Sequence, residues 1–192
     1  MFAAAVKRLA ARAAVAIGMA RIVRFRHDTN GATAVEFALV AVPFIAIMFA
    51  IVETALTFFA QQAMETAVQN AARLIRTGQA QKAGMTPFEF KGKICTQIEI
   101  MFNCMSGLSM DVRKYPTFDS INLSKPINDD GELVTDDFDY EPGKGGDIVV
   151  VRAYYKWPVL INFLGMNNYG DLAGGTHLIA TTAAFKNEPF PW

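Results

Sequence analysis

The residue most out of place in this sequence is Glu36, an acid inside a long apolar segment. The run 32–52 carries no other charged side chain. An ionisable group in such a segment is costly to bury and usually has a function, often through an opposite charge nearby. Phe37 follows it directly, and Gly31 lies five positions before it. Glu36 is therefore the first candidate functional residue; a side chain that reaches the membrane–water interface is the simpler alternative.

The bond between Gly31 and Ala32 has the character of a protease site. The cluster His27–Gly31 consists largely of turn formers and predicts a break in helical structure just before the apolar run. A small residue in an extended turn fits a protease cleft that excludes larger side chains. A basic segment before this bond and an apolar helix after it would hold the site at a membrane surface.

The two cysteines, Cys95 and Cys104, form the second candidate site. Both follow the apolar run, on the side of the chain for which we argue export below, where oxidising conditions permit a disulfide. A bridge would close a short loop and stabilise the domain by about 2–3 kcal/mol in the loop-entropy picture. Two reduced core cysteines are the alternative.

Catalytic and metal-binding sets are not evident. His27 lies in the leader turn, and His177 has no nearby Cys, Asp or Glu at a ligand spacing, so we expect a surface or hydrogen-bonded structural role for His177. Gly143–Gly146 lacks the features of a phosphate-binding loop and indicates a turn. The acidic segment 128–147 does not match the EF-hand template; we expect a solvated loop, with calcium binding as the alternative. The sequence thus predicts a non-enzyme with no cofactor, metal or small-molecule substrate.

Charge is distributed unevenly around the apolar run. Residues 1–31 hold six basic side chains and one acid, a net of +5, and the other 161 hold 12 basic and 17 acidic side chains, a net of −5. About 20 apolar residues cross a hydrocarbon core of about 30 Å. Basic residues mark the cytoplasmic side, so the amino end is expected in the cytoplasm and the rest outside it. Because the chain after residue 31 is net acidic, the sequence offers no basic patch for binding nucleic acid.

The pattern predicts one helix from Ala32 to Gly78. Pro43 interrupts its hydrogen bonding and either kinks it or has no mechanical role. Beyond Val52 the helix becomes amphipathic. Its expected apolar face is Leu56, Phe59, Ala63, Ala67, Ala71 and Leu74, and its polar face is Gln61, Glu65, Gln69, Arg73 and Arg76.

The remaining chain predicts a small domain. Thr86-Pro87-Phe88-Glu89 is a capping box that starts a helix running to about Phe102. Strands are expected at 108–112, 149–157 and 178–185. We expect an α+β fold in which an antiparallel sheet packs on the outer half of the long helix. The organisation is a basic cytoplasmic leader 1–31, a transmembrane helix 32–52, its extracytoplasmic extension 53–78, and a small extracytoplasmic α+β domain 79–192.

The order of these motifs resembles class III prepilins and, more closely, TadE-like pseudopilins. Those families have Gly at a cleavage point, Glu five residues later and an aromatic at six, as Gly31, Glu36 and Phe37 stand here. The resemblance extends through Gly31-Ala-Thr-Ala-Val-Glu-Phe-Ala-Leu-Val40, Pro43, Ala71-Ala-Arg73, Thr77-Gly78, the two cysteines, Gly146-Asp-Ile-Val-Val-Val151 and Phe185-Lys-Asn-Glu-Pro-Phe190.

The resemblance implies cleavage after Gly31 by an aspartic prepilin peptidase, with Ala32 as the new amino terminus. It implies a minor pilin-like subunit that assembles with other pilins and pseudopilins of a tight-adherence (Flp) pilus. The protein would be a single-pass inner-membrane protein with a periplasmic domain, or enter the pilus. An uncut extracytoplasmic sensor or ligand-binding protein is the alternative, and a membrane-tethered hydrolase lacks a catalytic set.

Overall fold

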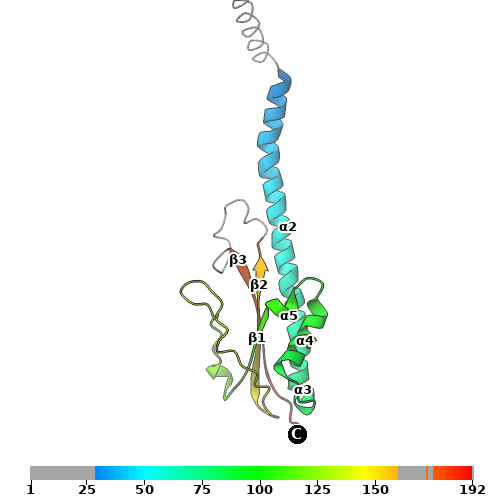
Figure 1. Cartoon of the computed structure of the whole chain (residues 1–192), viewed down its shortest axis with the longest axis vertical. Helices are drawn as coiled ribbons and strands as arrows, with labels where there is room; N and C mark the ends of the chain where they lie inside the picture. The colour runs from blue at the N-terminus through cyan, green and yellow to red at the C-terminus, as the bar shows by residue number, and fades with distance from the viewer. Residues whose placement is uncertain (1–28, 160–171, 173–174, 192) are drawn as a thin grey trace, which may run out of the picture. The chain divides into compact units, whose positions relative to one another are not determined.

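The longest element is the helix α2, Thr29–Arg76. The computed structural model describes residues 29–159, 172 and 175–191. The chain forms two compact units, Met1–Phe49 and Ala50–Trp192. Most of the predicted leader, including His27, lies outside the described residues. The helix continues through Pro43, and Figure 1 shows α2 as an unbroken ribbon.

The predicted break just before Ala32 is wrong for the part that is described. Thr29, Asn30 and Gly31 are already helical. A glycine inside a helix costs about 1 kcal/mol relative to alanine, which a long helix can absorb. The Gly31 position contacts no other atoms: a Cβ there would meet nothing within 4 Å.

The helix ends at Arg76, two residues before the predicted end. Gly78 adopts φ +76°, and its N–H donates to the Ile75 carbonyl at 3.0 Å. A Cβ on Gly78 would come within 2.7 Å of the Phe190 ring, so glycine is required both by conformation and by space. A short helix, α3 (Gln79–Lys82), follows.

The helix α4, Pro87–Ile98, begins as predicted. Thr86 accepts a hydrogen bond from the Glu89 N–H, and the Glu89 carboxylate accepts one from the Thr86 N–H. It ends at Ile98 and not near Phe102. Phe102 instead packs edge-on against Tyr155 and Trp157, at centroid distances of 4.7 and 5.5 Å, and this contact requires the chain to turn. The helix α5, Cys104–Gly107, follows the turn.

Three antiparallel strands complete the domain, as the sequence predicts. They are β1 (Leu108–Tyr115), β2 (Ile148–Pro158) and β3 (Thr176–Lys186), with β2 in the centre. The register aligns Val112 with Val151 and Val151 with Ala183. The β1–β2 connection contains a short 3-10 helix, η1 (Phe118–Ser120).

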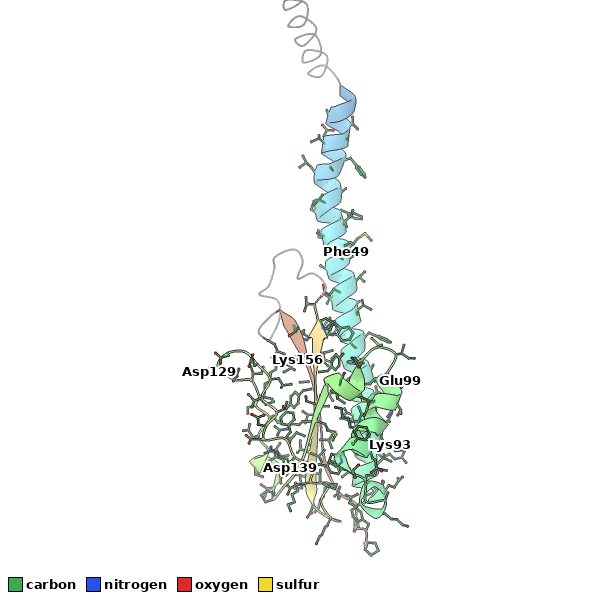
Figure 2. The ribbon with its side chains drawn as sticks, viewed as in Figure 1. Phe49, Lys93, Glu99, Asp129, Asp139 and Lys156 are labelled. Carbon is green, nitrogen blue, oxygen red and sulfur yellow. A yellow bond between two sulfur atoms is a disulfide. The ribbon has the colours of Figure 1, made fainter. Side chains whose placement is uncertain are left out.

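Both faces of the sheet are covered, which explains the unbroken apolar run at the start of β2. Within the second unit, α2 and α4 cover one face and the β1–β2 connection covers the other (Figure 1). Figure 2 shows Asp129 and Asp139 of that connection on the side away from Lys93 and Glu99. Val149 and Val151 face the helices, whereas Tyr154 belongs to the cluster under the connection.

The buried face of α2 is rotated from the predicted one. Ala67 and Ala71 are buried as expected, but Leu56 and Phe59 are 41% and 63% exposed. The polar face is exposed as predicted. The stripe that packs on the sheet consists mostly of small residues, which allow the backbones a close approach, whereas the bulky Leu56 and Phe59 point outward. The buried stripe is Ala60, Met64, Ala67, Val68, Ala71, Ala72 and Ile75.

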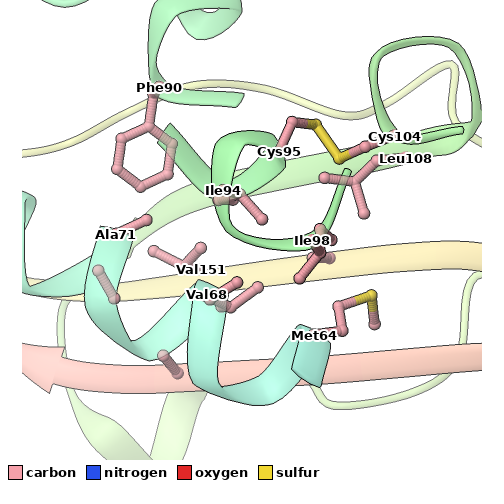
Figure 3. Close-up of a cluster of buried hydrophobic side chains, with 14 of the residues drawn as sticks. Met64, Val68, Ala71, Phe90, Ile94, Cys95, Ile98, Cys104, Leu108 and Val151 are labelled. Atoms are coloured by element: carbon pink, nitrogen blue, oxygen red, sulfur yellow. A yellow bond between two sulfur atoms is a disulfide. The ribbon is translucent and has the colours of Figure 1, made fainter. Parts of the chain in front are cut away.

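We expect Ala71→Leu to destabilise the domain by about 1–3 kcal/mol, because the added atoms have no space between α2 and the sheet. Figure 3 shows Ala71 beside Val68 and Val151 in the packed core. The measurement is urea unfolding of the full chain in a non-ionic detergent, followed by tryptophan fluorescence. Gln69→Leu, on the exposed face of the same helix, is the matched control. Equal effects of the two substitutions would contradict the close-packing argument.

Candidate functional site

The residues of the predicted cleavage junction share one exposed stretch of α2. Gly31, Ala32, Glu36 and Phe37 are all exposed, and Phe37 is 74% exposed. One helical turn separates Ala32 from Glu36, which places the two residues about 6 Å apart along the axis. The described part of the first unit offers no protein partner to either residue's side chain.

The apolar segment of α2 has the exposure of a membrane span. Its most apolar window has a mean hydropathy of 2.6, and none of that window is buried. The core helix of a soluble protein would be largely buried. Exposed large side chains run from Val35 to Val52 without a break of more than a few residues. The helix is compatible with a single-pass membrane protein.

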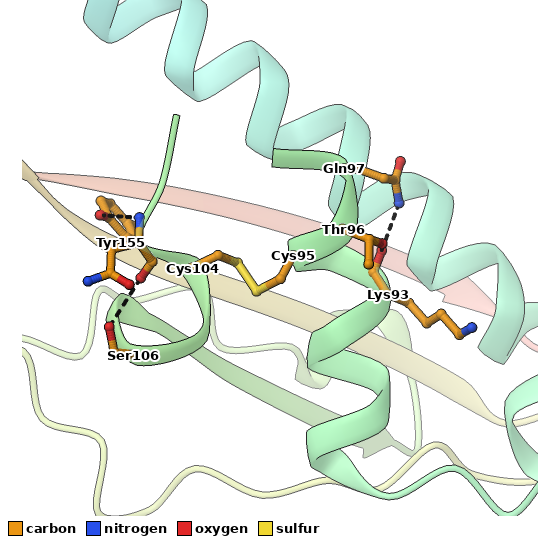
Figure 4. The surroundings of a disulfide bond; sticks show 8 residues. Lys93, Cys95, Thr96, Gln97, Cys104, Ser106 and Tyr155 are labelled. Atoms are coloured by element: carbon orange, nitrogen blue, oxygen red, sulfur yellow. Dashed lines mark hydrogen bonds between the residues drawn. A yellow bond between two sulfur atoms is a disulfide. The ribbon is translucent and has the colours of Figure 1, made fainter. Parts of the chain in front are cut away.

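A disulfide joins Cys95 on α4 to Cys104 at the start of α5, with the Cα atoms 5.4 Å apart. Both cysteines are 4% exposed. Figure 4 shows the bridge crossing from α4 to the segment beside Tyr155, whose hydroxyl accepts a hydrogen bond from the Asn103 N–H at 3.2 Å. The bridge fixes the turn that inserts Phe102 into the core.

A buried ionic cluster centred on Asp111 was not predicted from the sequence. Asp111 is fully buried on β1, and its Oδ2 lies 2.6 Å from Arg152 Nη2 on the neighbouring strand β2. Its Oδ1 accepts from Arg113 Nε at 2.8 Å and from the Asp139 N–H at 3.0 Å. Asp111 and Arg152 are register partners. The sequence contained one signal for this cluster: an acid, Asp111, and a base, Arg152, lie on two strands that pair with each other.

The environment of Asp111 favours its charged form. Burial acts to raise the pKa, but the hydrogen bonds from the Asp139 N–H, Arg113 and Arg152 outweigh it, so the pKa of Asp111 is lowered. The Asp139 bond also ties the β1–β2 connection to the sheet. Asp111 thus links two strands and the segment that covers them.

The other predicted sites remain separate. His177 lies on β3 opposite Trp157. Some carboxylates of the acidic segment bond to nearby backbone, as Asp147 Oδ2 does to the Lys144 N–H at 2.8 Å. Among the described residues, no three His, Cys, Asp or Glu side chains are placed to hold a metal ion. The calcium alternative therefore gains no geometric support.

A further buried acid, Glu53, was also not singled out from the sequence. It is 9% exposed and lies on α2 just beyond the predicted span. Its backbone carbonyl accepts a hydrogen bond from Thr57 Oγ1 at 3.0 Å.

Comparison with known families supports the resemblance of the junction. The family model described as TadE-like protein matches residues 31–73. The match begins at Gly31 and includes Glu36, Phe37 and part of the buried stripe of α2. It covers well under half of the chain. Comparisons with curated proteins and with solved structures gave no significant match.

We expect Asp111→Asn to lower the free energy of unfolding by about 2–3 kcal/mol at neutral pH, because two arginines lose their shared charged acceptor. The folded-state pKa is lowered, so the carboxylate's contribution is present above its ordinary pKa of about 3.9 and is lost as the pH falls through the lowered value. The difference between the two proteins should therefore shrink below about pH 4. Denaturant unfolding at several pH values measures it.

The matched control is Asp129→Asn, at an exposed position of the β1–β2 connection. It should change stability by less than about 0.5 kcal/mol. A pH-independent gap between wild type and Asp111→Asn would show that the cluster acts by packing and not by charge.

Proposed function

We propose that this chain, whose residues 31–73 match the TadE-like family, is a minor pilin-like subunit associated with a tight-adherence (Tad) pilus. The observation that carries the proposal is the coincidence of that match with an apolar, unburied helix. Such a helix anchors the subunit in a membrane and offers a surface to neighbouring helices. In this proposal the membrane is the bacterial inner membrane, with the amino end cytoplasmic and the domain periplasmic.

The proposal includes processing between Gly31 and Ala32 by a prepilin peptidase. Gly31 is helical in the structure, whereas proteases bind extended substrates, so the first turn of α2 would have to unwind. Glycine lowers the cost of unwinding because it is a poor helix former. No other part of the described chain covers Gly31, and the bond is accessible.

Glu36 is the proposed assembly residue. Cleavage would leave a free amine on Ala32, about 6 Å from Glu36 along the helix axis. In a bundle of pilin helices the carboxylate would be buried against apolar side chains, which costs several kcal/mol without a partner. The amino terminus of a neighbouring subunit can supply the opposite charge. Such a pair would also fix the axial register of one helix against the next.

The first prediction of this proposal concerns processing. Gly31→Val should block cleavage, because a branched side chain does not fit a protease cleft that accepts only small residues. The uncut, longer form of the protein should then accumulate in membranes. Gly31→Ala is the matched control and should be cut at least in part. The amino-terminal sequence of the protein recovered from membranes is the measurement. An intact leader in normal cells would contradict processing and favour the uncut sensor.

The second prediction separates assembly from insertion. Glu36→Gln should leave membrane insertion and cleavage largely intact but reduce co-purification with other pilins by roughly tenfold, the effect of losing a charge pair of about 1.4 kcal/mol or more. Glu65→Gln removes a carboxylate from the exposed polar face of α2 and is the matched control. Pilus counts by electron microscopy provide the second readout. Wild-type levels of both would leave Glu36 as an interfacial residue only.

A further inference from the structure

A cavity of about 310 Å³ lies between the sheet and the β1–β2 connection, on the face away from α2 and α4. A volume near 300 Å³ is at the lower end for small-ligand sites. Arg113, Tyr115 and Arg152 of the sheet line one side. The connection contributes the rest of the wall, namely Asn122, Ser124, Pro126, Ile127, Val134, Asp137 and Phe138.

The two arginines are held in place by the buried Asp111. Arg152 donates to Asp111 through Nε and Nη2, and to the Asn122 carbonyl through Nη1 at 3.0 Å. Arg113 donates through Nε to Asp111 and through Nη2 to the Asp137 carbonyl. A guanidinium has five N–H groups. Nη1 of Arg113 has no hydrogen-bond partner among the described residues, so a positioned donor pair remains available.

The charges around the site balance. Two guanidinium groups share one carboxylate, Asp111, and the Asp137 carboxylate at the cavity wall offsets the remaining positive charge. Asp137 also lines the cavity, and its carboxylate would repel a multiply charged anion such as phosphate. The N–H groups on Arg113 Nη1 can donate to a carboxylate oxygen, and such a charge-assisted hydrogen bond is stronger than one between neutral groups. The opposite wall, formed by Pro126, Ile127, Val134 and Phe138, is apolar.

We propose that this cavity binds a monocarboxylate attached to a small apolar body, with Arg113 Nη1 donating to the carboxylate, Arg152 fixing Asp111 behind it, and the connection covering the apolar part. The end of an apolar peptide and a free carboxylic acid of similar size share this chemistry. The site is independent of Glu36 and of processing, so its failure would leave the proposed assembly role untouched.

The test is calorimetric titration of the full chain in a non-ionic detergent. The probes are N-acetyl-valyl-phenylalanine, its carboxamide and 3-phenylpropionate. The acid should bind at least about tenfold more tightly than the amide, because the amide loses a charge-assisted hydrogen bond. Tighter binding of the dipeptide acid than of 3-phenylpropionate would identify a peptide end, and the reverse order a free acid.

Three variants locate the site. Arg113→Gln should weaken binding of the acid by about tenfold or more. Lys114→Gln removes the same charge from the next position, which does not line the cavity, and should change affinity by less than about twofold. Ser124→Phe should abolish binding by filling the cavity while both arginines remain, so the test does not depend on the folding of Arg113→Gln.

Four results would overturn the proposal. Neither acid binds; the amide binds as well as the acid; Lys114→Gln weakens binding as much as Arg113→Gln does; or Ser124→Phe leaves binding unchanged. The NMR signals of the Arg113 and Arg152 Nε–H groups give an independent readout. They should shift with the acid and not with the amide.

Discussion

The packing of one face of α2 against the sheet is the constraint on which the second unit depends. In the described part of the chain the sheet has three strands, and its central strand carries apolar side chains on both faces. Without the stripe from Ala60 to Ile75, the side chains of Val149 and Val151 would face water. Four of the seven residues in the stripe are alanine, which lets the helix approach the sheet closely, and Met64 and Ile75 fill the space that remains. α4 then closes the same core through Phe90, Ile94 and Ile98.

A disulfide, a buried ionic cluster and a hydrogen bond at the end of α2 add to the stability that the small hydrophobic core provides. The disulfide ties α4 to α5 and keeps Phe102 inserted beside Tyr155. On the other face, Asp111 connects β1, β2 and the long connection through one buried carboxylate. At the far end of α2, the Glu188 N–H donates to the Arg76 carbonyl at 2.9 Å, and Phe190 covers Gly78. The Asp111 cluster and the Arg76–Glu188 bond join segments distant in sequence, whereas the disulfide closes a short loop, and all three limit local opening.

The two units carry different chemistry. Residues 31–49 contain no buried side chain, so their apolar surface is available to lipid or to other helices. The single carboxylate on that surface, Glu36, is the one group there that can distinguish a charged partner from lipid. The domain carries charged groups on its helices, its sheet and the β1–β2 connection, and the arginine-lined cavity lies between the last two. In the proposals made above, membrane anchoring and ligand binding therefore use separate surfaces.

The sequence by itself determined the features that follow from local pattern. The hydropathy pattern predicted the long helix, and the Thr86–Glu89 capping box predicted the start of α4. The alternation of apolar and polar residues predicted three strands. The junction motif indicated the TadE-like resemblance, and the family match also begins at Gly31. These features depend on residues close together in the chain, whose spacing alone encodes them.

Tertiary structure decided what depends on distant residues. Leu56 and Phe59 fit the helical period, yet they point outward because the sheet selects a different stripe of α2. α4 stops early because Phe102 has partners on β2. The Asp111 cluster needs the β1–β2 register, and the cavity needs the path of the connection over the sheet. Periodicity shows that a face exists, but only packing between segments shows which face is buried and which charged groups meet.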